Sequence, residues 1–163
     1  MDKQIIVING TGGSGKDTFV EFVSKHAKTF NFSSVDKVKE IAKIIGWNGQ
    51  KSEKDRKFLS DLKRLTTEYN DMSFKSIHEA ILSFYESDNE IMFIHIREPE
   101  EIARAVSAFN AKTLLVKRIG LTNITSNYSD ANVENYNYDY IIENDTLESL
   151  HSQSIEFVNK IKT

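Results

Sequence analysis

A glycine-rich run near the start of the chain has the residue types needed to hold a phosphate group. Residues 10–18 fit the spacing G-x-x-x-x-G-K. Glycines allow consecutive backbone N–H groups to turn inward around a phosphate, because no Cβ atom obstructs them. Lys16 adds a mobile positive charge for the β- and γ-phosphates of a nucleoside triphosphate. We expect this nucleotide to be ATP. The expected ATP-binding residues of this run are Gly10, Gly12, Gly13, Ser14, Gly15, Lys16, Asp17 and Thr18.

The loop departs from the common pattern at one position. Asp17 stands where Ser or Thr usually holds Mg²⁺, and Thr18 follows it. The offset is similar to that of adenylate and cytidylate kinases. This similarity implies that Mg²⁺ binds together with ATP and that the protein holds the ion through water, with no direct protein ligand. The plainer alternative is a glycine turn that binds nothing, although four glycines and a lysine exceed what a turn requires.

Short apolar runs alternate with segments of helical periodicity, and these elements must position the loop. This order predicts an α/β protein with the three-layer fold of P-loop NTPases: a five-stranded parallel sheet with helices on both faces. The expected strands are residues 5–8, 30–32, 91–96, 112–117 and 138–142. The expected helices are residues 18–28, 36–45, 52–69, 74–85, 99–110 and 146–161.

Length and composition limit the classes of protein to consider. The 163 residues fit one domain, 1–163, and a net charge of −3 gives no general attraction to nucleic acid or an anionic membrane. The absence of cysteine excludes thiol chemistry. No apolar run is long enough for a signal peptide or a membrane span, so we expect a cytoplasmic protein without nucleic-acid or membrane partners. The oligomeric state is left open.

Four segments together resemble the deoxynucleoside monophosphate kinases of phages and bacteria. They are residues 14–18 of the loop, 34–40 (Ser-Val-Asp-Lys-Val-Lys-Glu), 94–97 (Ile-His-Ile-Arg) and 138–147. The resemblance follows the chain in order and implies an ATP- and Mg²⁺-dependent phosphotransferase acting on a (deoxy)nucleoside monophosphate. Animal-type phosphomevalonate kinases share much of the pattern, so another small phosphorylated metabolite stays open as the acceptor.

The resemblance also implies roles for matching residues. It implies a helical acceptor-binding region at about 35–87 and a short lid at about 119–137. The implied catalytic residues are Lys16, Arg97 and Arg118; the acceptor-binding residues are Asp36, Lys39, Arg56 and Arg97; and the residues beside the adenine end of ATP are Arg118, Asn144, Asp145 and Thr146.

Several of these positions have plainer interpretations. Asp36 could cap the helix that follows it, and Arg97 could pair with a nearby glutamate, Glu98 or Glu101. His95, on a buried strand, is interpreted as a core histidine. A different class also stays open, namely a nucleotide-binding module with little turnover. Its support is that His95 stands where the family has Asp and that residues 120–137 contain no Lys or Arg.

Overall fold

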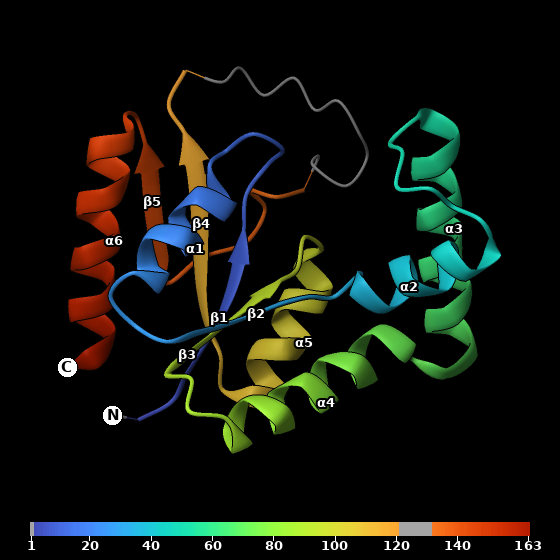
Figure 1. The fold of residues 1–163 in the computed structure, drawn as a ribbon, viewed down its shortest axis with the longest axis horizontal. Coiled ribbons are helices and arrows are strands. Elements are labelled where there is room, and N and C mark those ends of the chain that lie inside the picture. Colours follow the sequence, from blue (N-terminus) through green and yellow to red (C-terminus); the bar gives the residue numbers. More distant parts are fainter. Residues whose placement is uncertain (1, 121–131) are drawn as a thin grey trace.

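The structure, a computed structural model, describes residues 2–120 and 132–163. Five parallel strands form one sheet in the order β2-β3-β1-β4-β5 (Figure 1). The strands are β1 Gln4–Asn9, β2 Thr29–Ser33, β3 Ile91–His95, β4 Lys112–Arg118 and β5 Tyr140–Asn144. The helices are α1 Lys16–Ser24, α2 Asp36–Ile45, α3 Glu53–Asn70, α4 Met72–Glu86, α5 Pro99–Phe109 and α6 Leu147–Lys162. The predicted three-layer α/β P-loop fold is confirmed.

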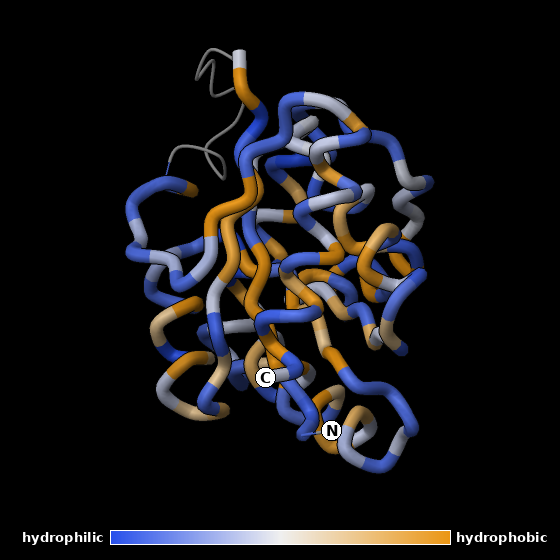
Figure 2. Tube along the Cα trace, turned by 90° about the vertical axis from the view of Figure 1, so that its left-hand side faces the viewer, coloured by the Kyte–Doolittle hydropathy of each residue, from blue (hydrophilic) through white to orange (hydrophobic). Residues whose placement is uncertain are grey.

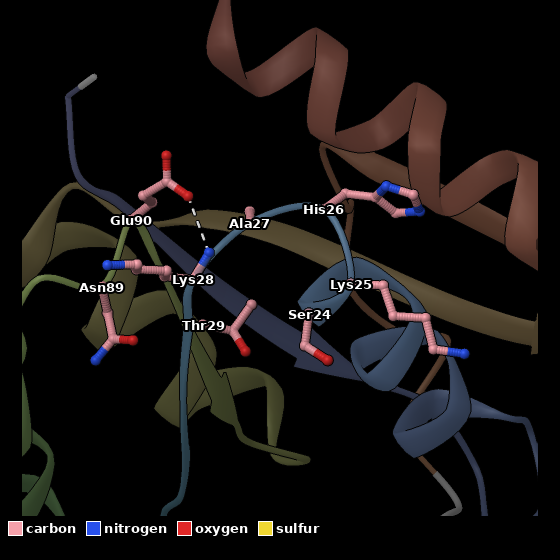
Figure 3. A pocket seen from close by; sticks show the side chains of 8 residues that line it. All are labelled: Ser24, Lys25, His26, Ala27, Lys28, Thr29, Asn89 and Glu90. Carbon is pink, nitrogen blue, oxygen red and sulfur yellow. Dashed lines mark hydrogen bonds between the residues drawn. The ribbon is translucent and has the colours of Figure 1, made fainter.

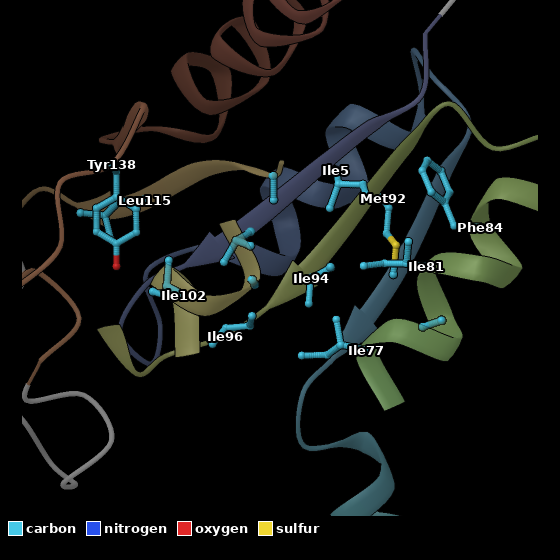
Figure 4. Packing of buried hydrophobic residues seen from close by; sticks show 14 of the residues in the cluster. Ile5, Ile77, Ile81, Phe84, Met92, Ile94, Ile96, Ile102, Leu115 and Tyr138 are labelled. Carbon is cyan, nitrogen blue, oxygen red and sulfur yellow. The ribbon is translucent and has the colours of Figure 1, made fainter. Parts of the chain in front are cut away.

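Two apolar clusters attach helices to the two faces of the sheet. On one face, Phe84 of α4 and Ile102 of α5 belong to the same cluster as Met92 of β3 (Figure 4). On the other face, Phe19 of α1 and Phe157 of α6 lie edge to face, with ring centroids 5.6 Å apart. The strands are apolar on both sides because helices cover both faces. Figure 2 shows these apolar strands running through the middle of the molecule.

Helices α2 and α3 lie outside the two layers, beyond α4 (Figure 1). Helix α3 packs against α2 and α4, and none of its side chains is buried. It begins with a capping box, in which the Ser52 hydroxyl accepts the Asp55 N–H and the Asp55 carboxylate accepts the Ser52 N–H. Gly46 ends α2 in the left-handed conformation, as the sequence predicts.

Several predicted boundaries are wrong by two residues or more. Helix α1 ends at Ser24 instead of residue 28, and α4 begins at Met72 instead of residue 74. Helix α1 begins at Lys16 instead of residue 18, because Gly15 is its N-cap. Strand β5 begins at Tyr140 instead of residue 138, because Tyr138 and Asp139 make side-chain hydrogen bonds before the ladder with β4 starts. Within the described parts of the chain, no helix is long and apolar enough to cross a membrane.

Candidate nucleotide site

The predicted phosphate loop lies at the carboxyl edge of the sheet, between β1 and α1. Strand β1 pairs with β3, and the helices that follow these two strands, α1 and α5, pack on opposite faces. Such a switch point is where open α/β sheets bind their ligands. The loop after β1 and residues 96–98 after β3 therefore flank the position at which the fold favours a ligand.

Two glycines of the loop occupy positions that other residues would strain. Gly13 and Gly15 have φ angles of 77° and 93°, in the left-handed region. A Cβ atom on Gly15 would also collide with the amide nitrogen of Asn144. A Cβ atom on Gly10 would lie 2.8 Å from the Val116 carbonyl oxygen, so the loop passes too close to β4 for a side chain.

Donors from the ends of β4 and β5 hold the loop in place. The Asn144 amide donates to the Ser14 carbonyl at 2.9 Å. Arg118 donates from Nη1 to the Gly13 carbonyl at 3.4 Å, and these two donors face each other in the β4–β5 register. The predicted residues Arg118 and Asn144 are thus brought together at the loop, and both donate hydrogen bonds to its backbone.

The N-terminus of α1 directs its backbone amides and the positive end of its dipole at the loop. Gly15 is the N-cap of the helix and, as a glycine, has no side chain that could accept a hydrogen bond from the first turn. The Ser14 hydroxyl is buried without a hydrogen-bond partner in the same described ranges. A helix start that follows a glycine turn and has glycine as its N-cap fits a phosphate anion.

The surroundings of the loop also fit magnesium held by phosphates and water. Asp17 is exposed and Thr18 is half-buried, and both lie in the first turn of α1. The described part of the chain contains no group of three His, Cys, Asp or Glu side chains that could hold an ion. Mg²⁺ keeps several waters and needs few protein ligands, so this arrangement suits it.

Asn9, which the sequence reasoning missed, connects the loop to two distant segments. It is fully buried at the end of β1, and its side-chain oxygen accepts the Gly10 N–H at 2.9 Å. Its Nδ2 donates to the Arg97 carbonyl at 3.1 Å and to the Tyr138 hydroxyl at 2.9 Å. Tyr138 in turn donates to the Val133 carbonyl at 2.6 Å. The sequence did contain a signal for Asn9, because it is a polar residue directly after the apolar run 5–8.

His95 belongs to this edge and not to the core, which corrects its interpretation as a core histidine. It is half-buried at the last position of β3, and its Nε2 donates to Asn31 Oδ1 at 2.5 Å. Burial, together with the positive charges of Lys16 and Arg97, lowers the pKa of His95 to about 4, although the charge of Asp17 opposes the shift. The imidazole is therefore neutral at physiological pH. A period-two pattern cannot tell a buried residue from the last residue of a strand.

Carboxylates and a lysine gather beside Arg97. Lys63 of α3 pairs with Glu101 of α5 at 2.9 Å, with both side chains half-buried. Glu98 lies nearby, where burial raises its pKa and the positive charge of Lys63 partly opposes the rise. Arg56, the predicted acceptor residue of α3, is exposed and lies about 10 Å along the helix from Lys63, at 1.5 Å per residue.

The two predicted acceptor residues on α2 differ in their surroundings. Asp36 is the first residue of α2 and not its cap, which corrects the capping interpretation. Its carboxylate accepts the Ser33 N–H at 3.0 Å, and Ser33 pairs with His95 across the β2–β3 ladder. Asp36 therefore stabilises the end of β2 beside His95, whereas Lys39 is exposed on α2.

The predicted adenine-side residues lie at the junction of β5 and α6. Thr146 caps α6 by accepting the Ser149 N–H at 3.1 Å, while Asp145 is exposed. Of the predicted lid, 119–137, residues 121–131 lie outside the described residues. Lys117 of β4 pairs with Glu134 at 3.0 Å, which ties the end of that segment to the sheet.

A separate surface hollow lies at the other end of α1 (Figure 3). Glu90 there accepts the Lys28 N–H at 2.9 Å. The hollow is far along α1 from the glycine loop, so we do not assign the nucleotide to it. Its lining residues are Ser24, Lys25, His26, Ala27, Lys28, Thr29, Asn89 and Glu90.

Comparison with known proteins identifies the fold but no sequence family. No protein-family model matches the chain, and no curated protein matches it significantly in sequence. Among solved structures, TT1252 from Thermus thermophilus is 15% identical over all of both chains, with a TM-score of 0.54. A Chloroflexus aurantiacus protein proposed to be a kinase is 10% identical over 98% of both chains, with a TM-score of 0.53. Thymidylate kinase from Ehrlichia chaffeensis is 12% identical over 97% of this chain and 100% of its own, with a TM-score of 0.49. At these identities the similarity shows the fold alone.

Proposed function

We propose that the protein transfers the γ-phosphoryl group of ATP to a small phosphorylated acceptor, preferably a (deoxy)nucleoside monophosphate. The observation that carries this proposal is the glycine loop at the switch point. Gly15 packs against Asn144 with no room for a side chain, and it is the N-cap from which α1 starts. Backbone amides and Lys16 at this position suit the β- and γ-phosphates of ATP.

ATP would bind with its phosphates in the loop from Gly10 to Thr18. Lys16 would contact the β- and γ-phosphates, and Arg118, which already touches the Gly13 carbonyl, would add positive charge from β4. The adenine end would lie near the β5–α6 junction, beside Asn144, Asp145 and Thr146. Mg²⁺ bound with ATP would neutralise charge on the phosphates.

The acceptor would lie on the other side of the switch point, in front of β3. Asn9 holds the Arg97 carbonyl and so positions this arginine beside the loop. Arg97 would bind the acceptor phosphate, and the helical region 35–87, with Asp36, Lys39 and Arg56, would enclose the rest of the acceptor. The segment 119–137 would act as a lid that excludes water.

Transfer requires positioning and charge neutralisation more than a strong base. An oxygen of the acceptor phosphate attacks the γ-phosphorus, and the bond from that phosphorus to the bridging oxygen breaks. ADP leaves with the bond's electron pair, and the acceptor gains one phosphoryl group. Lys16, Arg97 and Arg118 supply positive charge to the phosphoryl group as it moves.

The test is a panel of ribo- and deoxyribonucleoside monophosphates incubated with ATP and Mg²⁺, with ADP release as the readout. We expect release that depends on the acceptor, and its loss in Lys16→Ala. Lys25→Ala is a matched control, because Lys25 lies just beyond the other end of α1 and should leave transfer unchanged. Release that no nucleotide stimulates, or unaltered turnover in Lys16→Ala, would contradict the proposal.

A second candidate function is a nucleotide-binding module with little turnover. The observation in its favour is His95, neutral beside Lys16 and Arg97 at a position where the resembled kinases have Asp. Calorimetry with ATP separates the candidates, because a module binds ATP without acceptor-dependent ADP release. Phosphorylated mevalonate in the same panel tests the other kinase candidate.

A further inference from the structure

Two histidines from different elements meet on the side of the molecule formed by α1 and α6. His26 follows the end of α1, and His151 lies in the second turn of α6. Their Nε2 atoms are 3.4 Å apart, and both side chains reach solvent. Figure 3 shows the His26 ring pointing toward α6. The pair lies at the opposite end of α1 from the glycine loop, so it is separate from the nucleotide site.

The two rings rest on a rigid support. The Phe22 and His151 rings lie edge to face, with ring centroids 5.0 Å apart. The His26 N–H donates to the Val23 carbonyl at 2.9 Å, and the neighbouring Ala27 is buried. Below them, α1 and α6 share one apolar cluster. The spacing of the imidazoles is therefore set by packed elements.

The separation of the two nitrogens matches a shared metal ion better than a hydrogen bond. Hydrogen bonds from N–H groups have lengths of about 2.7–3.2 Å, so 3.4 Å is long for one. Zinc binds imidazole nitrogen at about 2.0–2.1 Å with tetrahedral angles, which places two ligating nitrogens about 3.4 Å apart. Neighbouring ligands of a square-planar ion with similar bonds would lie about 2.9 Å apart.

We propose that His26 and His151 bind a divalent transition-metal ion, zinc by geometry, and so join the end of α1 to α6. The ion has two protein ligands, because the described residues hold no group of three His, Cys, Asp or Glu, and water completes its coordination. Lys25, whose ammonium lies 4.9 Å from the centre of the Phe22 ring, is a nearby positive charge that weakens binding. A two-ligand site of this kind binds reversibly.

Calorimetric titration of the full chain with zinc chloride, after removal of metal and without nucleotide, tests the site. We expect one zinc per chain. His26→Gln and His151→Gln should each weaken binding at least about tenfold, because loss of either ligand removes the chelate. Both residues reach solvent, so the variants should fold. His78→Gln is the matched control, because His78 is exposed on α4 and stacks on Phe109.

Thermal unfolding gives a second readout. Zinc should raise the melting temperature of the wild type and of His78→Gln, and it should leave His26→Gln and His151→Gln unchanged, because only the folded chain brings the two ligands together. No zinc binding to the wild type, or full affinity in either single histidine variant, would overturn the proposal. A bound zinc that does not stabilise the fold would overturn the link between α1 and α6.

Discussion

At the scale of single residues, the glycines of the phosphate loop differ in what they require. Gly13 has a left-handed φ angle but open space around its Cβ position. Gly15 has a similar angle, and its Cβ position is filled by the Asn144 amide. The same amide donates to the Ser14 carbonyl, so a side chain at residue 15 would displace the group that holds the loop.

Replacement of these two glycines by alanine should separate the two effects. Gly13→Ala should cost about 1–2 kcal/mol in the free energy of unfolding, since only the backbone angle is strained. Gly15→Ala should cost more and should also abolish ATP binding, because Asn144 must move. Urea unfolding and ATP calorimetry of both variants are the measurements. Equal losses of stability in the two variants would mean that Asn144 does not restrict the loop.

A second prediction at this scale concerns pH. The pKa of His95, about 4 in the folded chain, lies below the ordinary value of 6.5. Between these values the unfolded chain binds a proton that the folded chain does not, so the contribution of His95 to stability falls as pH decreases from 6.5 to 4. The free energy of unfolding should change by at most about 1.4 kcal/mol per pH unit, which corresponds to a difference of one bound proton.

Urea unfolding of the wild type and of His95→Gln across this pH window tests the prediction. The stability of the wild type relative to the variant should decrease as the pH falls, because Gln binds no proton. Parallel pH profiles for the two proteins would indicate a His95 pKa near its ordinary value.

At the scale of elements, the sequence predicted every strand and helix in order, because each has a clear apolar pattern. The prediction was less accurate where a side chain competes with the backbone. The expected strand 138–142 included Tyr138 and Asp139, but their side chains make hydrogen bonds to Val133 and Thr113 before the ladder begins. Val133 is five residues from Tyr138, and Thr113 lies 26 residues from Asp139 in β4, so the apolar pattern of the strand indicates neither partner.

The same reason explains which parts of the candidate site were predicted. The glycine loop is a local motif, so its residues could be proposed as a phosphate site from their spacing alone, and that assignment stays a prediction. The contacts of Asn9 with Arg97 and Tyr138 span 88 and 129 residues. His95 owes its low pKa to burial and to charges on two other segments. Only the folded arrangement places these groups together.

The hydroxyl of Tyr138 gives a prediction at this scale. Tyr138→Phe removes the group that joins Asn9 to Val133, which leaves a buried carbonyl without its donor. We expect a loss of about 1–3 kcal/mol in the free energy of unfolding. Tyr136→Phe is the matched control, because Tyr136 packs edge to face on Tyr138 but is only half-buried. Similar losses in both variants, measured by urea unfolding, would show that the hydroxyl bridge adds little.

At the scale of the whole molecule, the loop draws on several distant elements. Residues from β1, β4 and β5 contact it directly, and α1 continues from it. Helix α3, by contrast, contacts mainly other helices and has no buried side chain. A ligand in the loop should therefore stabilise the sheet as a unit, and it should depend little on side chains at the far end of α3.

This leads to a prediction for thermal unfolding with ATP and Mg²⁺. A ligand that binds only the folded chain at 100 times its Kd adds about 2.7 kcal/mol. For a chain of this length that corresponds to a rise of roughly 5–10 °C in melting temperature. Lys16→Ala should lose most of this rise, since we propose that the charge of Lys16 contacts the β- and γ-phosphates. Arg56→Ala, on the exposed start of α3, should keep it when no acceptor is present. An equal rise in melting temperature for wild type and Lys16→Ala would place ATP elsewhere on the molecule. A loss confined to Lys16→Ala would assign the phosphates to the glycine loop, and this result does not depend on any catalysed transfer.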